Sequence, residues 1–263
     1  MAAMNPQRWP EPLLSRIENA GINASAPPQQ RWIDGWLVRF SPGKAKRARC
    51  VQAVADGRLP LHERLALCAA VLHDAGLPLI VRITPFSRPA GLDDALASRG
   101  FHRLDDTRVM VASLDSTCAE PLPDSVRLER LSPLAFAEAV GVLRGSPVGL
   151  RNAHAQRLAL SPVPYQGWAL SRRDDGALLA CGQIAIEADL VGLYDVFTAP
   201  HARGRGLATA LCTHLLDQAA QRGARHAYLQ VEGDNHAARQ VYRRLGFADG
   251  YAYHYRVEMA ESQ

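Results

Sequence analysis

One short segment, between an apolar run and a leucine-rich stretch, constrains the fold more than any other part of the sequence. It reads HARGRGLATAL and covers residues 201–211. The run before it, residues 191–198, has the composition of a strand, and Leu207, Leu211 and Leu215 recur at helical spacing after it. Glycine at such a junction lets the backbone turn tightly and approach a ligand closely. The segment therefore predicts a strand–loop–helix unit whose loop is shaped for a ligand.

An anion such as phosphate is the ligand that suits this loop. The first amide N–H groups of a helix have no partner within the helix, and they lie at the positive end of its dipole. Arg203 and Arg205 add charge that can pair with phosphate oxygens. A Walker loop requires GxxxxGK[ST], which the chain lacks, and a dinucleotide fold requires GxGxxG, whose third glycine is Thr209 here. The formal net charge of +4 supports a small anionic ligand more readily than nucleic acid.

The rest of the second half alternates strands and helices. Ser132 and Pro133 have the residue types of a helix N-cap and first helical position, and Asn235 offers a second cap. Expected strands cover residues 126–131, 167–171, 178–186, 191–198, 226–232 and 251–259, and expected helices cover residues 133–143, 152–160, 207–219 and 236–245. This order predicts a mixed α/β fold with a βαβ unit at its centre.

The first half repeats part of this layout. It has an expected helix, strand, helix and strand at residues 61–75, 79–84, 92–99 and 108–114, with Gly100-Phe101 where the second half has Gly246-Phe247. It lacks a paired-glycine loop, because the residues before its first helix read DGRLP. The aperiodic segment 113–125 carries two prolines and predicts a linker. We therefore expect two domains, residues 1–118 and 119–263.

Three segments of the second half together resemble the GNAT family of acetyl-CoA-dependent N-acetyltransferases. VFTAP at residues 196–200 is similar to the family's cofactor-facing strand end, and RGRGLA at 203–208 is similar to its R-x-x-G-x-A pyrophosphate loop. NHAARQVYRRLGF at 235–247 is similar to its N-x-x-A-x-x-x-Y-x-x-L-G-F signature. The resemblance covers about residues 124–259, and the first half resembles a degenerate copy. It implies tandem GNAT-like domains, each with a central mixed β-sheet flanked by helices.

The resemblance also implies an activity and a cofactor site. The chain would transfer an acetyl or short acyl group from acetyl-CoA, its co-substrate, to a primary amine of a small molecule or peptide, by direct attack in a ternary complex. Tyr242 would protonate the departing thiolate, since a phenol with an ordinary pKa of about 10 is protonated at neutral pH. The residues implied in cofactor binding are Val196, Phe197, Thr198, Arg203, Gly204, Arg205, Gly206, Leu207, Ala208, Thr209, Asn235 and Tyr242.

The general base has several candidates. Asp195 lies beside the proposed reaction centre and ranks first, ahead of Glu187 and Glu232, which end two of the expected strands. Family members often use water relays, and the glutamate sometimes found earlier in this strand is replaced here by Gly192. One open alternative is therefore that the chain has no direct base. Because such a chain need not be catalytic, a non-catalytic acyl-CoA-binding or sensing module is an alternative function. A nicotinamide-dependent enzyme is a second alternative.

The remaining composition excludes several classes of protein. Five cysteines without a CxxC pair predict no disulfide framework, and nine histidines without HExxH spacing predict no metal site. No apolar run approaches the roughly 20 residues of a membrane span, and the N-terminal residues lack an apolar signal-peptide core. We expect a cytoplasmic protein without nucleic-acid or membrane partners. Its acceptor amine and oligomeric state stay open.

Overall fold

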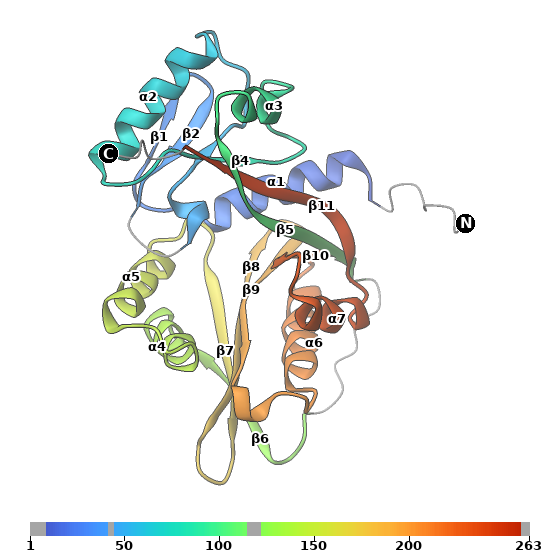
Figure 1. Cartoon of the computed structure of the whole chain (residues 1–263). Helices are drawn as coiled ribbons and strands as arrows, with labels where there is room; N and C mark the ends of the chain where they lie inside the picture. The colour runs from blue at the N-terminus through green and yellow to red at the C-terminus, as the bar shows by residue number, and fades with distance from the viewer. Residues whose placement is uncertain (1–8, 42–44, 115–121, 259–263) are drawn as a thin grey trace. The chain divides into compact units, whose positions relative to one another are not determined.

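The fold consists of two compact units that interleave along the chain. The computed structural model describes residues 9–41, 45–114 and 122–258 (Figure 1). Unit 1 comprises residues 1–24, 109–231 and 235–250, and unit 2 comprises residues 25–108, 232–234 and 251–263. Strands β5 (His102–Ser113) and β11 (Ala248–Val257) therefore contribute residues to both units. The predicted boundary between residues 118 and 119 lies outside the described residues and stays a prediction.

Unit 1 is built on a mixed sheet with the strand order β5-β10-β9-β8-β7-β6. The strands not yet given are β6 (Val126–Leu131), β7 (Tyr165–Arg172), β8 (Leu178–Glu187), β9 (Leu190–Thr198) and β10 (His226–Glu232). From β6 to β9 the neighbours are antiparallel, whereas β9 and β10 are parallel. Helix α6 (Leu207–Ala220) joins this parallel pair. The predicted central βαβ unit is thus confirmed.

Helices cover both faces of the sheet of unit 1 (Figure 1). One face packs against α4 (Pro133–Leu143) and α5 (Val148–Ala159), and the other packs against α6. Successive side chains of a strand point to opposite faces, so the adjacent residues Ala180 and Cys181 of β8 belong to two different hydrophobic cores. Helix α7 (His236–Arg244) follows β10, and the N-terminal helix α1 (Glu11–Ala24) contacts β9.

Unit 2 repeats the βαβ arrangement on a smaller scale. Its strands follow the order β1-β2-β3-β4-β11-β5. The new elements are β1 (Gln30–Ile33), β2 (Trp36–Arg39), the 3-10 turn η1 (Lys46–Ala48), β3 (Val51–Gln52), α2 (Leu61–Asp74), β4 (Ile80–Ile83) and α3 (Leu92–Ala97). β3 and β4 are parallel and joined by α2, as β9 and β10 are joined by α6. The predicted repeat and mixed α/β fold are confirmed.

Local signals account for most element boundaries. Ser132 Oγ accepts the Ala135 N–H at 3.2 Å, which is the predicted cap of α4. Helix α5 begins directly after Pro147, four residues before its predicted start at 152, because proline suits the beginning of a helix. Sequence reasoning missed α1, although its buried Leu13, Ile17 and Ala20 follow helical spacing.

None of the helices in the described ranges combines the length and the apolar content that a membrane crossing requires.

Candidate functional site

The glycine loop adopts the backbone conformation that its sequence predicts. After β9 the chain forms a 3-10 turn, η2 (Pro200–Ala202), and then reaches Gly204 and Gly206 with φ of +76° and +74°. This left-handed region favours glycine. Gly206 is the N-cap of α6, and no heavy atom lies within 4 Å of the position a Cβ would take at either glycine. The loop therefore presents open backbone at a helix N-terminus.

The side chains that flank this loop are cationic. Arg203 Nε donates to the carbonyl of Thr198 at 3.3 Å, and its guanidinium lies 5.6 Å from the Phe197 ring centre. Arg205 is exposed. Leu207, Ala208 and Thr209 form the first turn of α6, where backbone N–H groups have no partner within the helix. The end of β9, the loop and the start of α6 are thus consecutive parts of one potential anion site in unit 1.

An irregularity interrupts the pairing of β9 with β8 immediately before that strand ends. Tyr194 is paired with Gln183 and Phe197 with Cys181, so Asp195 and Val196 lie opposite the single residue Gly182. Asp195 has a φ of +50°, which is uncommon for a residue with a side chain. This two-against-one arrangement is a β-bulge, and bulges locally bend a strand and redirect its side chains.

Asp195 is surrounded by polar partners from three other elements. Arg144, the C-cap of α4, places Nη1 3.0 Å from Oδ1, and Gln183 of β8 donates from Nε2 to Oδ2 at 2.8 Å. His154 of α5 places Nε2 3.3 Å from Oδ2. Burial alone would raise the pKa of Asp195, but His154, Arg144 and Arg157 hold that pKa well below its ordinary value. Asp195 therefore stays ionised at neutral pH and is a weak base.

The other two carboxylates considered as bases have different surroundings. Glu187 accepts hydrogen bonds from Asn23 Nδ2 of α1 at 2.9 and 3.2 Å. Glu232 is exposed and belongs to unit 2. Which group takes the amine proton stays a prediction.

Tyr242 lies on α7 and packs against the core of unit 1. Its ring meets Phe247 edge to face at 6.0 Å between ring centres. Burial, with a smaller effect of the Cys212 thiol, raises the pKa of the Tyr242 phenol well above its ordinary value. The phenol is therefore protonated at neutral pH, as a proton donor must be.

Asn235 begins α7 as the sequence predicts. Its Oδ1 accepts the Ala238 N–H at 3.1 Å, so the predicted cap is confirmed. A contact between Asn235 and a cofactor stays a prediction.

Gly192 of β9 lies where two tyrosines leave no room for a side chain. A Cβ at this position would be 2.7 Å from Cζ and 2.8 Å from the oxygen of Tyr228, and it would also overlap the Tyr194 ring. The two phenol oxygens are 2.8 Å apart and hydrogen-bonded. Glycine is therefore required here because the rings of Tyr194 and Tyr228 occupy the space that a side chain at position 192 would need.

The substitution Gly192→Ala tests this packing. We expect it to lower the free energy of unfolding by about 1–3 kcal/mol, as overpacking of a core does, measured by denaturant titration. Gly149→Ala is the matched control, because no heavy atom lies within 4 Å of its Cβ position and Gly149 is helical. We expect that control to be neutral or slightly stabilising. A stable Gly192→Ala protein would show that the tyrosine pair moves aside readily.

The corresponding loop of unit 2 is filled by a carboxylate of the chain itself. Asp34 accepts the N–H groups of Arg58 and Leu59, each at 2.9 Å, in the loop before α2. Arg64 Nε lies 3.0 Å from the same carboxylate. The two backbone hydrogen bonds, together with Arg64, hold the pKa of Asp34 below its ordinary value. A Cβ at Gly57 would overlap Asp34 and Arg64, so this loop is closed.

Sequence reasoning singled out the loop, Asp195 and Tyr242 as candidate site residues, and it did not identify the partners of Asp195. Arg144, His154 and Gln183 belong to no local motif, since each meets Asp195 only through the tertiary fold. Within residues 9–41, 45–114 and 122–258 no group of three or more histidine, cysteine, aspartate or glutamate side chains could hold a metal ion.

Known proteins share this sequence pattern and fold. The profile of the family described as "Acetyltransferase (GNAT) family" matches residues 137–247. The chain is 27% identical over 241 residues to the uncharacterized N-acetyltransferase YobR of Bacillus subtilis, and the alignment covers 87% of this chain and 92% of that protein.

Two solved structures have a similar fold at low sequence identity. A GCN5-related N-acetyltransferase from Kribbella flavida has a TM-score of 0.65 and 17% identity, with 94% of this chain and 95% of that one covered. A tandem GNAT protein from the clavulanic acid biosynthesis pathway has a TM-score of 0.63 and 15% identity, and the alignment covers 77% of this chain and 70% of that one. Residues 137–247 thus match the GNAT family of acetyltransferases, and the two solved structures share the fold of the chain.

Proposed function

We propose that this protein transfers an acetyl or short acyl group from acetyl-CoA to a primary amine by direct attack in a ternary complex. The observation that carries the proposal is the open glycine loop at the start of α6, which directly follows the bulged end of β9. These features lie in the segment that the family profile matches. Acetyl-CoA, when bound, supplies a thioester whose carbonyl carbon an amine can attack.

The residues of the loop fit the pyrophosphate of coenzyme A. Residues 204–209 lie at the start of α6, the positive end of its dipole, where their backbone N–H groups would stabilise a phosphate. Gly204 and Gly206 keep the backbone accessible because no side chain covers it. Arg203 and Arg205 add charge beside these amides. This fit supports a cofactor role for the loop.

The end of β9 would hold the acyl arm through its backbone. Val196 is part of the bulge, and Phe197 and Thr198 follow it and lead to the loop. A backbone amide near Val196 would polarise the acetyl carbonyl, because a positioned N–H donor stabilises charge that develops on oxygen. Tyr242 would give its proton to the departing sulfur, which its partly buried and protonated phenol supports.

A non-catalytic acyl-CoA-binding or sensing module is the second candidate. One observation favours it: the carboxylate beside the bulge, Asp195, is paired with Arg144 and lies against His154, so its basicity is low. Tyr242 counts against this candidate, since sensing alone needs no proton donor. The acceptor would bind near residues 143–165, and its identity is open. A cytoplasmic location stays a prediction.

We expect one molecule of coenzyme A to bind per chain. In unit 2 the Asp34 carboxylate occupies the amide donors of the loop before α2, which leaves no open site for an external phosphate. Isothermal titration calorimetry with coenzyme A should give a stoichiometry close to one. A stoichiometry of two would show that unit 2 also binds the cofactor.

A thiol-release assay with acetyl-CoA and a panel of amines tests the proposed function. Wild-type protein should release free coenzyme A only when a suitable amine is present. A thermal-shift measurement with acetyl-CoA alone reports binding independently of turnover, because a ligand that binds the folded state raises the melting temperature.

A further inference from the structure

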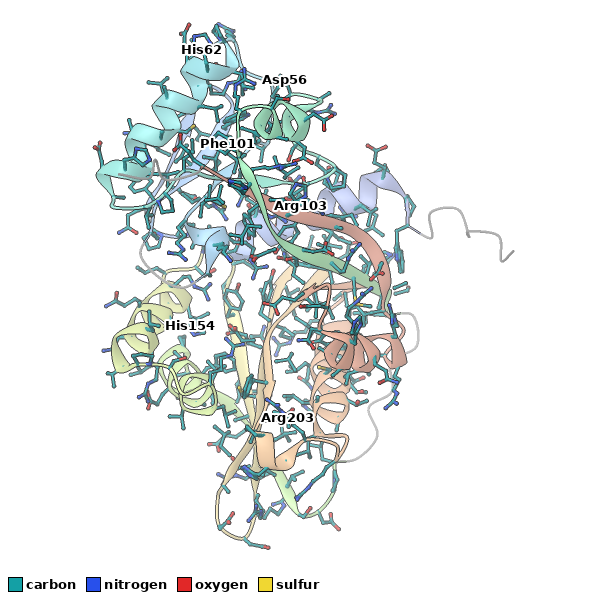
Figure 2. All side chains as sticks on the ribbon, in the orientation of Figure 1. Asp56, His62, Phe101, Arg103, His154 and Arg203 are labelled. Atoms are coloured by element: carbon teal, nitrogen blue, oxygen red, sulfur yellow. The ribbon has the colours of Figure 1, made fainter. Side chains whose placement is uncertain are left out.

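We infer that His154 is the group that takes the proton from the acceptor amine, and that Asp195 holds its ring in position. This inference rests on the proposed acetyl transfer and adds to it the proton acceptor. Four side chains carry it: His154 of α5, Asp195 of β9, Arg144 at the end of α4 and Gln183 of β8. All four belong to unit 1, and Figure 2 labels His154 on the helix beside the sheet.

The bulge in β9 brings Asp195 to His154. With a φ of +50°, Asp195 departs from the regular alternation of the strand, and its carboxylate meets residues of the α4 and α5 layer. Val196, the next residue, is the one whose amide would face the acetyl carbonyl. His154 therefore lies against a residue adjacent to the proposed reaction centre.

The two members of the pair differ in their capacity to accept a proton. Asp195 is held ionised beside the guanidinium groups of Arg144 and Arg157, and protonating it would weaken its interactions with Arg144 and His154. A neutral imidazole has a free lone pair on one ring nitrogen, and a carboxylate beside the ring stabilises the imidazolium that forms. The arrangement thus favours His154 as the acceptor and Asp195 as a positioning residue.

The surroundings of His154 leave one ring nitrogen available. Nε2 is buried and faces Oδ2 of Asp195 at 3.3 Å, so Asp195 occupies this side of the ring. Nδ1 has no hydrogen-bond partner in the part of the chain that the structure describes, and the side chain is 18% exposed. Phe136 of α4 packs edge to face on the ring at 6.5 Å, which limits its movement. Nδ1 is therefore the atom that would receive the proton.

The step balances without a further reactant. The acceptor nitrogen forms a bond to the acetyl carbon and gives a proton to Nδ1 of His154. The carbon–sulfur bond breaks, its electron pair stays on sulfur, and Tyr242 supplies the proton that makes the free thiol. His154 then releases its proton to solvent, and Tyr242 regains one from solvent.

The test compares His154→Ala and His154→Gln with a control substitution, His226→Ala, elsewhere in unit 1. His226 lies 4.0 Å from Asp189, which also pairs with Arg16, so this cluster repeats the histidine, carboxylate and arginine composition. His226 lies on β10 and is paired with Leu190 of β9, five residues before Asp195. The probe is acetyl-CoA with the amine of the panel that gives the fastest thiol release.

Both His154 variants should lose about 100- to 10,000-fold in kcat, the usual effect of removing an acid–base group. Their affinity for acetyl-CoA should be unchanged, and added imidazole should restore part of the activity of His154→Ala. His226→Ala should keep the wild-type kcat and show no response to imidazole. Asp195→Asn should lower kcat without any rescue by imidazole, because imidazole cannot replace a carboxylate.

Two results would overturn the inference. One is a wild-type kcat in folded His154→Gln, and the other is a loss of activity in folded, cofactor-binding His154→Ala that imidazole does not restore. If His154→Ala does not fold, His154→Gln alone decides. Absence of amine-dependent thiol release by the wild-type protein would instead refute the proposed function, and the inference with it.

Discussion

Replacing Tyr242 with phenylalanine is expected to lower the rate of acetyl transfer by about 100- to 10,000-fold, or roughly 3–5 kcal/mol of barrier. The substitution keeps the ring that packs on Phe247 and removes only the phenol proton. Because burial raises the pKa of Tyr242, the wild-type phenol is protonated and able to donate throughout the neutral range. The measurement is single-turnover thiol release, in which chemistry and product release are separated.

The Tyr242→Phe result has two controls. Affinity for acetyl-CoA and the thermal midpoint should change little, since the ring and its core contacts remain. Loss of cofactor binding would make Tyr242 an anchor for the cofactor. A wild-type rate under single-turnover conditions would rule out its role as an acid.

The substitution Gly206→Val should weaken coenzyme A binding by about tenfold or more. A β-branched residue at a φ of +74° is strained by about 1–2 kcal/mol or more, and relief of that strain would turn the loop amides away from the phosphates. Calorimetry with coenzyme A measures the loss directly, and 1.4 kcal/mol corresponds to a factor of about ten in affinity.

Gly223→Val is the matched control for Gly206→Val. Gly223 follows α6 at its other end, has a φ of +93° and, like Gly206, has no heavy atom within 4 Å of its Cβ position. The two substitutions therefore impose the same kind of backbone strain at opposite ends of one helix. We expect Gly223→Val to lose stability and keep its cofactor affinity. Equal affinity in both variants would show that the loop does not bind the pyrophosphate.

Local patterns were sufficient to predict most elements of the fold. The leucine spacing after Gly206, the caps at Ser132 and Asn235 and the alternation in β6 each act within a few residues, so sequence alone shows them. The short strands β1 to β3 were missed because two to four residues carry too little periodicity.

The polar cluster around Asp195 could not be predicted because it depends on tertiary contacts. Asp195 and Arg144 are separated by 51 residues, and the bulge that turns Asp195 toward α4 and α5 appears only in the register of β8 and β9. The same holds in unit 2, where Asp34 reaches the N–H of Arg58 across 24 residues. The DGRLP string shows that the paired glycines are absent, and it does not show that a carboxylate fills the loop.

The division of strands between the two units is a further feature without a local signal. β5 and β11 each have residues in both units, so neither unit is a continuous stretch of sequence. A proline-containing segment suggests a single boundary along the sequence. Pairing between strands that are far apart in the sequence leaves no local sequence pattern from which it could be predicted.

Thiol release from acetyl-CoA, measured with and without an amine panel on the same protein preparation, tests the central claim most directly. The proposed mechanism predicts release that depends on the amine, with the acetylated amine detected by mass spectrometry. Binding of acetyl-CoA without release for any amine would contradict acetyl transfer and leave the acyl-CoA-binding module as the better account.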